Sequence, residues 1–416
     1  MPLVPRAVAD HLLEELRRSP VVFLNGPRQA GKSTLARAIL KKAWPAEYVT
    51  LDEATQLGAA SADPEGFLRG HEGPLVIDEV QMAPGLFRAL KVAVDEARLE
   101  NPRAARGRYL LTGSANVLAL PKLSSALVGR MAVVTLYPFS ALEISRGKGG
   151  FLPTLFENGF KSRRSGEGGA LLEVLRRATF PEIAEEGDAA RARWFENYVT
   201  AILQRDVRQI ADIEKLGVLP NLLRVLAGRT GGLINESDIG RSVGLNSVTA
   251  RNYRVLLGAM FLTFGVGPWF RNTGKRFVKS PKGYLTDTPL LCHLLQVDPG
   301  KAAARDPALF GRVLENFVAS ELLKQLAHSG ERAELLHFRG TGGQEADFVL
   351  ERPGGAVAGI EVKARESVGP DDFRGLKELQ ARAGKDFACG AVLYRGASFV
   401  PFGEKLWAVP VSALWE

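Results

Sequence analysis

Residues 26–33 have the types and spacing that could hold a nucleotide phosphate. They read Gly-Pro-Arg-Gln-Ala-Gly-Lys-Ser between an apolar run at 21–24 and a helix-like stretch, which matches the G-x-x-x-x-G-K-[ST] phosphate loop. The glycines let backbone N–H groups face phosphate oxygens, and the helix adds its positive N-terminus. Lys32 is expected to reach the β- and γ-phosphates, and Ser33 to ligate Mg²⁺. The predicted nucleotide contacts are Gly26, Pro27, Arg28, Gln29, Ala30, Gly31, Lys32, Ser33 and Thr34.

Two acids at the end of another apolar run could complete this site. Asp78 and Glu79 follow Leu-Val-Ile at 75–77, a pattern typical of a buried strand. Asp78 is expected to hold the Mg²⁺ shell, and Glu79 to polarise the water that attacks the γ-phosphate. The alternatives are an ordinary glycine-rich turn and a surface acid pair after a core strand. The phosphate-loop pattern and the acid pair occur together, which argues against both alternatives.

The ends of other predicted strands offer two further candidates. Strand-like runs occur at 48–52 and 109–114, and ligands of a parallel sheet gather at the carboxyl ends of its strands. Ser114, or its neighbour Thr112, is therefore expected to sense the γ-phosphate, with a Gly-Ser turn as the alternative. Arg130 could act catalytically on the nucleotide of a neighbouring subunit, as an arginine finger, or be a plain surface arginine.

The C-terminal part carries a second set of chemically suggestive residues. Glu361 and Lys363 are two apart on a predicted strand and therefore face the same side. A hairpin through 353–355 would bring Asp347 close to Glu361, so that the two carboxylates could hold a divalent metal. Lys363 could activate the attacking water, and Glu315, on a predicted helix, could complete the metal shell. The alternative is a solvated charge pair on an exposed strand.

The middle of the chain contains a helix-turn-helix pattern. Residues 236–243 and 247–257 are helix-like, and Gly-Leu-Asn separates them. The core-facing positions of the second helix are predicted to be Val248, Tyr253, Leu256 and Leu257. Its exposed or edge positions are predicted to be Ser247, Thr249, Arg251, Asn252 and Arg254. Such donors are what a DNA-recognition helix needs.

A basic hairpin is predicted to follow these helices. Residues 269–284 contain no acid, and a turn at 272–274 would make a wing that contacts DNA. The basic residues of this segment are Arg271, Lys275, Arg276, Lys279 and Lys282. The alternative is a helical scaffold whose hairpin is merely solvated.

Length and composition predict a soluble protein of several domains. The chain has 416 residues, of which 46% are hydrophobic and 24% charged, and no apolar run is long enough to span a membrane. The predicted domains are an ATPase core (1–145), a basic linker with a helical segment (146–215), a winged-helix-like domain (216–290) and a nuclease-like domain (300–416). Within the helical segment, Arg205 and Asp206 either face a nucleotide or form an internal ion pair.

Charge and cysteine content bear on partners and compartment. The net charge of +8 suits a polyanionic partner such as DNA, although basic proteins without nucleic-acid ligands are common. Cys292 and Cys389 lie far apart, which favours a reducing cytoplasm over a disulfide framework. No secretory signal is recognisable at the N-terminus, so we expect a cytoplasmic protein.

Taken together, these motifs resemble prokaryotic AAA-type ATPases of the AAA+ superfamily, whose C-terminal half was long catalogued as a domain of unknown function. The segments that carry the resemblance are 24–34, 77–81, 112–114, 204–207, 345–348 and 360–363. The last two resemble the PD-(D/E)XK nucleases, especially archaeal Holliday junction resolvases, although Ala346 stands where a proline is usual. The resemblance implies an α/β protein with a P-loop AAA+ core, a helical or winged-helix middle and a C-terminal α/β domain like restriction endonucleases.

The same resemblance implies ATP and Mg²⁺ as cofactors and a homo-oligomer. Our first hypothesis is a DNA-dependent ATPase that acts on branched or junction DNA, with a possible metal-dependent endonuclease site. The second is a nucleotide-regulated DNA-binding protein whose nuclease-like site is dead. A third is an ATPase switch that has only protein partners.

Overall fold

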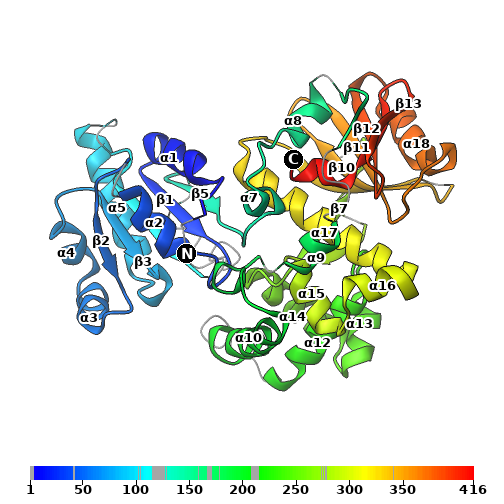
Figure 1. The fold of residues 1–416 in the computed structure, drawn as a ribbon. Coiled ribbons are helices and arrows are strands. Elements are labelled where there is room, and N and C mark those ends of the chain that lie inside the picture. The colour runs from blue at the N-terminus through cyan, green and yellow to red at the C-terminus, as the bar shows by residue number, and fades with distance from the viewer. Residues whose placement is uncertain are drawn as a thin grey trace. The chain divides into compact units, whose positions relative to one another are not determined.

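A computed structural model gives the fold of the chain (Figure 1). It describes residues 4–40, 43–101, 103, 105–114, 127, 129–157, 159–165, 171–177, 179–207, 215–272, 274, 276, 279–340 and 342–416. The side chains of Arg205 and Asp206, part of the predicted basic linker at 166–169, and the hairpin residues Thr273, Lys275 and Phe277 lie outside the description. The chain forms two units. The first is 1–138 with 259–261 and 327–330, and the second is the remainder.

The first unit is built on a parallel sheet with strand order β2-β3-β4-β1-β5. Its strands are β1 (Val21–Asn25), β2 (Glu47–Thr50), β3 (Leu75–Asp78), β4 (Tyr109–Gly113) and β5 (Met131–Thr135). Its helices are α1 (Ala9–Arg18), α2 (Lys32–Leu40), α3 (Ala54–Ala62), α4 (Pro64–Arg69) and α5 (Leu86–Glu100), with a 3-10 turn at Val80–Met82. The predicted doubly wound α/β core is confirmed.

The side chains of β1 alternate between the two faces of this sheet, and helices cover both faces. Val21 and Phe23 pack into the cluster that contains residues of α3, α4 and α5, whereas Val22 and Leu24 pack against α1 and α2. A strand that is apolar at every position is typical of a parallel sheet buried on both sides. The carboxyl ends of β1 and β3 therefore meet at one edge of the sheet, where polar residues follow them.

The second unit begins with helices. They are α7 (Ala141–Ser145), α8 (Phe151–Phe156), α9 (Leu171–Arg176), α10 (Asp188–Ala201), α12 (Leu219–Gly228), α13 (Glu236–Val243), α14 (Ser247–Ala259), α15 (Thr288–Leu295), α16 (Pro299–Arg305) and α17 (Pro307–His328). Short 3-10 turns lie at Pro181–Ile183 and Leu216–Val218, and a π-helical turn at Ile202–Asp206. In the described part of the chain, no helix is both long enough and apolar enough to cross a membrane.

The helix-turn-helix forms at the predicted residues. Gly244 ends α13 in a left-handed conformation (φ 70°), which glycine adopts without strain, and the Asn246 side chain caps α14 by accepting from the Thr249 N–H at 2.8 Å. Tyr253 is buried as predicted, but the prediction for Val248 is wrong because its exposed fraction is 67%. The winged-helix type of this region stays a prediction.

One sheet carries the rest of the second unit, with strand order β6-β13-β14-β12-β11-β10-β9-β7-β8. The strands are β6 (Arg163–Arg164), β7 (Thr263–Pro268), β8 (Lys282–Leu285), β9 (Glu334–Arg339), β10 (Glu345–Glu351), β11 (Val357–Lys363), β12 (Phe387–Tyr394), β13 (Ser398–Gly403) and β14 (Leu406–Pro410). Helix α18 (Arg374–Ala383) lies between β11 and β12, and 3-10 turns lie at Pro370–Phe373, Gly384–Asp386 and Val411–Leu414.

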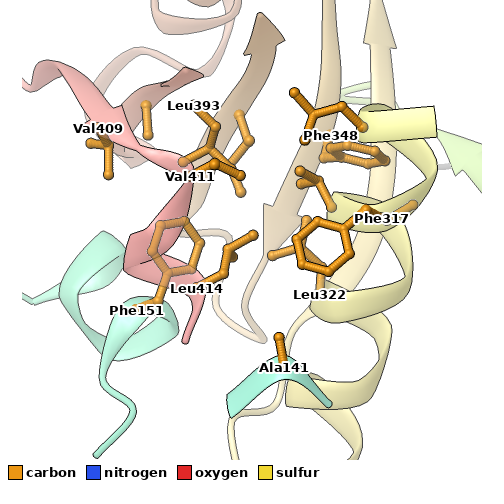
Figure 2. Packing of buried hydrophobic residues seen from close by; sticks show 14 of the residues in the cluster. Ala141, Phe151, Phe317, Leu322, Phe348, Leu393, Val409, Val411 and Leu414 are labelled. Atoms are coloured by element: carbon orange, nitrogen blue, oxygen red, sulfur yellow. The ribbon is translucent and has the colours of Figure 1, made fainter. Parts of the chain in front are cut away.

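Two apolar clusters cover opposite faces of this sheet. Figure 2 shows the first, in which Phe317 and Leu322 of α17 face Phe348 of β10, and Phe151 of α8 lies near Leu414. The second joins α18 to the strands through residues such as Leu376 and Val349. The sheet is thus held between α17 and α8 on one side and α18 on the other.

The antiparallel strand pair found here differs from the predicted hairpin at 269–284, because β7 ends at Pro268, before that segment, and β8 begins at Lys282, near its end. β7 and β8 are antiparallel, with Val266 opposite Lys282, and β7 also pairs in parallel with β9. The region predicted as a winged-helix-like domain (216–290) and the region predicted as nuclease-like (300–416) therefore share one continuous sheet. Although β9 and β7 lie between β10 and β8 in the strand order, a side chain of β8 reaches both α17 and β10, which matters for the carboxylates described below.

Candidate functional site

The phosphate loop lies between the carboxyl end of β1 and the first turn of α2. Gly26 has φ 146°, and a Cβ added there would lie 2.1 Å from the Leu136 backbone oxygen, so this position requires glycine. Lys32 opens α2 with only 5% of its surface exposed. Its Nζ donates to the Gly26 backbone oxygen at 3.0 Å and to the Pro27 backbone oxygen at 2.8 Å. The Lys32 side chain thus lies across the phosphate loop.

Asp78, at the end of β3, connects this loop to the neighbouring strands. Its Oδ1 accepts from Ser33 Oγ at 3.2 Å and also from Thr112 Oγ1. Its Oδ2 accepts from the hydroxyl of Tyr48 on β2. Hydroxyl and carboxylate oxygens are the ligands that Mg²⁺ prefers, so the residues present fit a Mg²⁺ ion bound together with ATP.

Glu79 follows Asp78 in a left-handed conformation (φ 58°), which turns its carboxylate out of the strand line. That carboxylate accepts from Gln81 Nε2, which also donates to Ser114 Oγ at 3.4 Å. Ser114 therefore reaches the site through Gln81. Burial raises the pKa of Glu79, although Gln81 and Lys32 favour its charged form.

The second group of predicted residues lies in the second unit. Asp347 on β10 and Glu361 on β11 lie side by side, since the adjacent residues Phe348 and Ile360 are paired across these strands. Asp347 Oδ2 accepts from the Val362 backbone N–H at 2.9 Å. The predicted approach of the two carboxylates through a hairpin therefore occurs.

Lys282, which we predicted to be part of a basic wing, is buried among these acids. Its Nζ lies 3.1 Å from Glu315 Oε1 and 3.1 Å from Asp347 Oδ1. Burial alone would lower the pKa of Lys282, but Asp347 and Glu315 raise it overall, so the group is an ammonium ion. The hydroxyl of Tyr284, also on β8, donates to Glu315 Oε1 at 2.7 Å.

Glu361 and Lys363 form the other end of this group. Lys363 Nζ donates to Glu361 Oε1 at 2.6 Å, and within the described residues Glu361 Oε2 is buried without a hydrogen-bond partner. Burial, and then the negative charge of Asp347, raise the pKa of Glu361 to about 8 and that of Glu315 to about 7. We call Lys282, Glu315, Asp347, Glu361 and Lys363 the carboxylate cluster.

The cluster as arranged does not fit a divalent ion. An ammonium group lies between Glu315 and Asp347, where the predicted metal shell needs an ion. Across the described ranges, no group of three or more His, Cys, Asp or Glu side chains is placed to hold a metal. The prediction that Asp347, Glu361 and Glu315 share a metal is therefore without support in this geometry.

Comparisons with known proteins find one family match that lies mainly in the first unit and two that lie mainly in the second unit. Residues 18–145 match the family described as "AAA domain". Residues 169–301 and 310–414 match two families described as "Domain of unknown function" (DUF8612 and DUF4143). An uncharacterized protein of Mycobacterium tuberculosis is 31% identical over 410 residues, which cover 98% of this chain and 84% of that protein. A Mycobacterium bovis protein matches equally.

The chain belongs to the family of these mycobacterial proteins, and it carries an AAA-type ATPase domain. An uncharacterized protein of Haemophilus influenzae is 24% identical over 60% of this chain and 57% of that protein. Among solved structures, a Walker-type ATPase of Pyrococcus abyssi has 15% identity and a TM-score of 0.43, covering 71% of this chain and 96% of that one. Cdc6p from Pyrobaculum aerophilum has 13% identity and a TM-score of 0.27, covering 72% and 97%.

Within the AAA-type domain, Arg130 is the predicted site residue that lies away from the nucleotide loop. It precedes β5, whose first residue pairs with Val21 at the start of β1, whereas the loop follows the end of β1. Its Nε donates to Asp95 Oδ1 at 2.6 Å, and this contact raises the pKa of Arg130 and lowers that of Asp95. A role at the nucleotide of a neighbouring subunit stays a prediction.

Tyr48 is a residue of the AAA-type domain that sequence reasoning missed as part of the site. Burial, and then its hydrogen bond to Asp78, raise the pKa of Tyr48 to about 12, so it remains a neutral donor throughout the neutral pH range. The only sequence signal was a tyrosine in a strand next to the acid-bearing strand. The register that brings its hydroxyl to Asp78 comes from β2 pairing with β3.

We expect Tyr48→Phe to slow ATP hydrolysis about tenfold and to raise the Mg²⁺ concentration needed for half-maximal rate. The reason is that a hydrogen bond to a charged group contributes about 1.5–3 kcal/mol, part of which holds Asp78 in place. Phosphate release across a Mg²⁺ titration measures this. Tyr109→Phe is the control, because Tyr109 begins β4 and its hydroxyl accepts from Arg108 Nε. Equal Mg²⁺ titrations for Tyr48→Phe and the parent protein would contradict a positioning role.

Proposed function

We propose that the protein hydrolyses ATP at the phosphate loop and that its nucleotide state controls binding to DNA. The observation that carries the first part is the 3.2 Å hydrogen bond between Ser33 Oγ and Asp78 Oδ1. It places a hydroxyl at the start of α2 beside a carboxylate at the end of β3, the pair that a Mg²⁺–ATP site needs. When bound, Mg²⁺ would neutralise charge on the phosphate oxygens.

The residues of the loop have separable tasks in this proposal. Phosphate oxygens replace the backbone oxygens of Gly26 and Pro27 as acceptors for Lys32, because charged acceptors make stronger hydrogen bonds than neutral ones. Glu79 orients and deprotonates the attacking water. Its carboxylate accepts from Gln81, which holds it beside the loop.

Support for a DNA partner comes from the outward face of α14. Arg251 and Asn252 are exposed there, and they are the donor types that read guanine and adenine edges in a major groove. Val248 and Val255 are 67% and 50% exposed on the same helix, and apolar contacts of this kind suit thymine methyl groups. By contrast, Arg254 pairs with Glu236 at 2.7 Å and is committed within the unit.

We expect Arg251→Ala to weaken DNA binding by about tenfold or more, since one good base contact contributes about 1–3 kcal/mol. If the arginine contacts a phosphate instead, the slope of the log binding constant against log salt concentration should become less steep by about one. Fluorescence anisotropy with labelled duplex at several salt concentrations measures both. Arg374→Ala, the same charge change at an exposed residue that begins α18, is the control. Equal losses for the two variants would make the effect one of net charge and not of α14.

The predicted basic wing gives weaker support. Arg276 contacts Glu351, with its Nη2 donating at 3.0 Å, and Lys282 is buried in the carboxylate cluster. Two of its positive charges are therefore neutralised inside the second unit. The DNA proposal accordingly rests on α14 and on the net charge of +8, and branched DNA is one of the substrates to test and not a separate conclusion.

A nuclease-like fold for the C-terminal region is part of the proposal. It is supported by α17 and the β10–β11 hairpin, which bring Glu315, Asp347 and Glu361 to one place, and by α18, which follows this hairpin in the chain. The test is incubation of purified protein with Mg²⁺ and ATP on linear duplex, single-stranded and four-way-junction DNA. Binding or ATPase stimulation supports a DNA partner. Neither one on any substrate would contradict it.

A second candidate is an ATPase switch whose α14 binds a protein. The two exposed valines favour it, because apolar side chains are also what a protein interface buries. An ATPase that no DNA stimulates or binds would favour this candidate over the first.

A further inference from the structure

Lys282 connects elements that are distant in sequence. It opens β8, its side chain is 8% exposed, and its Nζ lies 3.1 Å from a carboxylate of α17 and 3.1 Å from a carboxylate of β10. A buried ammonium held equally by Glu315 and Asp347 is at the position that a bridging cation would take. The neighbouring Tyr284 hydroxyl, from the same strand, also donates to Glu315.

Each acid of the carboxylate cluster lies within hydrogen-bond distance of one of its lysines. Lys282 and Lys363 carry two positive charges among the carboxyl groups of Glu315, Asp347 and Glu361, at the hydrogen-bond distances given above. Asp347 also accepts from the Val362 N–H. In the described part of the chain, Glu361 Oε2 is the cluster oxygen that is buried without a hydrogen-bond partner.

We propose that the Lys282 ammonium takes the place of a divalent cation in the carboxylate cluster. The cluster therefore binds no metal, and its ion pairs connect β8, α17 and β10. The two kinds of cation cannot share the position. An ammonium donates hydrogen bonds at about 2.7–3.2 Å, whereas Mg²⁺ needs oxygens at about 2.0–2.1 Å in octahedral geometry. A divalent ion brought next to Lys282 would also be repelled by its charge.

The consequence for the C-terminal region is that it does not cleave DNA by a metal-dependent route. This goes beyond the proposed function, since it concerns neither ATP hydrolysis nor the DNA-binding face of α14. A further consequence is that removing the ammonium should create a metal site. Glu315 and Asp347 would then lose the ammonium that lies between them, and a divalent cation could take its place.

The experiment compares the full-length protein with its Lys282→Met variant in the absence of nucleotide. Manganese binding is followed by electron paramagnetic resonance, and thermal unfolding is recorded in EDTA and in Mn²⁺. Lys282→Met should bind one added Mn²⁺ at least about tenfold more tightly than the parent protein. It should unfold at a lower temperature than the parent in EDTA and regain about 5 °C or more in Mn²⁺. Asp347→Asn added to Lys282→Met should abolish both gains.

Lys324→Met is the matched control. Lys324 is also buried, and its Nζ lies 3.3 Å from Glu321 Oε1, so its loss should destabilise the protein without any recovery in Mn²⁺. The proposal is overturned if the parent protein binds Mn²⁺ in a manner lost in Asp347→Asn, or if Lys282→Met folds and gains no Mn²⁺ affinity. If Lys282→Met does not fold in any medium, Mn²⁺ binding by the parent and by Asp347→Asn alone decides. Either outcome leaves the ATPase proposal untouched, because no nucleotide is present.

Discussion

Lys32→Ala is expected to abolish ATP hydrolysis, with a loss of about 10³-fold or more in turnover. Lys32 is buried in the loop, where its ammonium donates to the backbone oxygens of Gly26 and Pro27. Alanine leaves no cation to replace it when charge develops on the β- and γ-phosphates. Phosphate release at saturating ATP and Mg²⁺ measures the loss, and equilibrium binding of a fluorescent ATP analogue shows how much of it is affinity.

Lys91→Ala is the control for this variant. Lys91 is an exposed lysine of α5 in the same unit, so its removal changes net charge without touching the loop. We expect its turnover to match that of the parent protein. Normal turnover in Lys32→Ala would show that hydrolysis occurs elsewhere or belongs to a contaminant.

Glu79→Gln is expected to bind ATP normally and to hydrolyse it about 10²- to 10⁴-fold more slowly, the range for loss of a general base. The amide keeps the size of the side chain and removes the carboxylate that orients water. Single-turnover hydrolysis separates the chemical step from binding. Undiminished turnover in this variant would move the role to another residue.

The pH dependence gives an independent check on Glu79. Burial raises its pKa, so the carboxylate form is lost on acidification at a higher pH than for an exposed glutamate. The general base must be ionised, and turnover should therefore fall as the pH drops through this raised pKa. The residual rate of Glu79→Gln should lack that fall. A parent profile that is flat down to the ordinary range of a glutamate would contradict the assignment.

The first unit could be predicted from sequence because its signals are local. The glycines at 26 and 31 follow the apolar run of β1 within a few residues, and the acids at 78 and 79 follow the apolar residues of β3 directly. Parallel topology then brings the carboxyl ends of β1 and β3 to one edge without further information. The placement of Ser33 beside Asp78 is the result of this arrangement.

The parts that were missed depend on contacts between distant segments. In the sequence, Lys282 is one of several basic residues in a polar segment, and its partners Glu315 and Asp347 lie 33 and 65 residues further along the chain. Tyr48 meets Asp78 through the register of β2 and β3. Val248 shows the limit of helical periodicity, because this apolar residue at a core-like position is 67% exposed.

The central claim is that ATP hydrolysis at the phosphate loop is coupled to DNA. The most direct measurement is the steady-state ATPase rate of the full-length protein with no DNA and with equal masses of linear duplex, single-stranded and four-way-junction DNA. Lys32→Ala run in parallel gives the background. We predict that at least one DNA raises the rate several-fold above the DNA-free value while Lys32→Ala stays at background. A rate that no DNA changes, together with no DNA binding in the presence of ATP, would contradict the account.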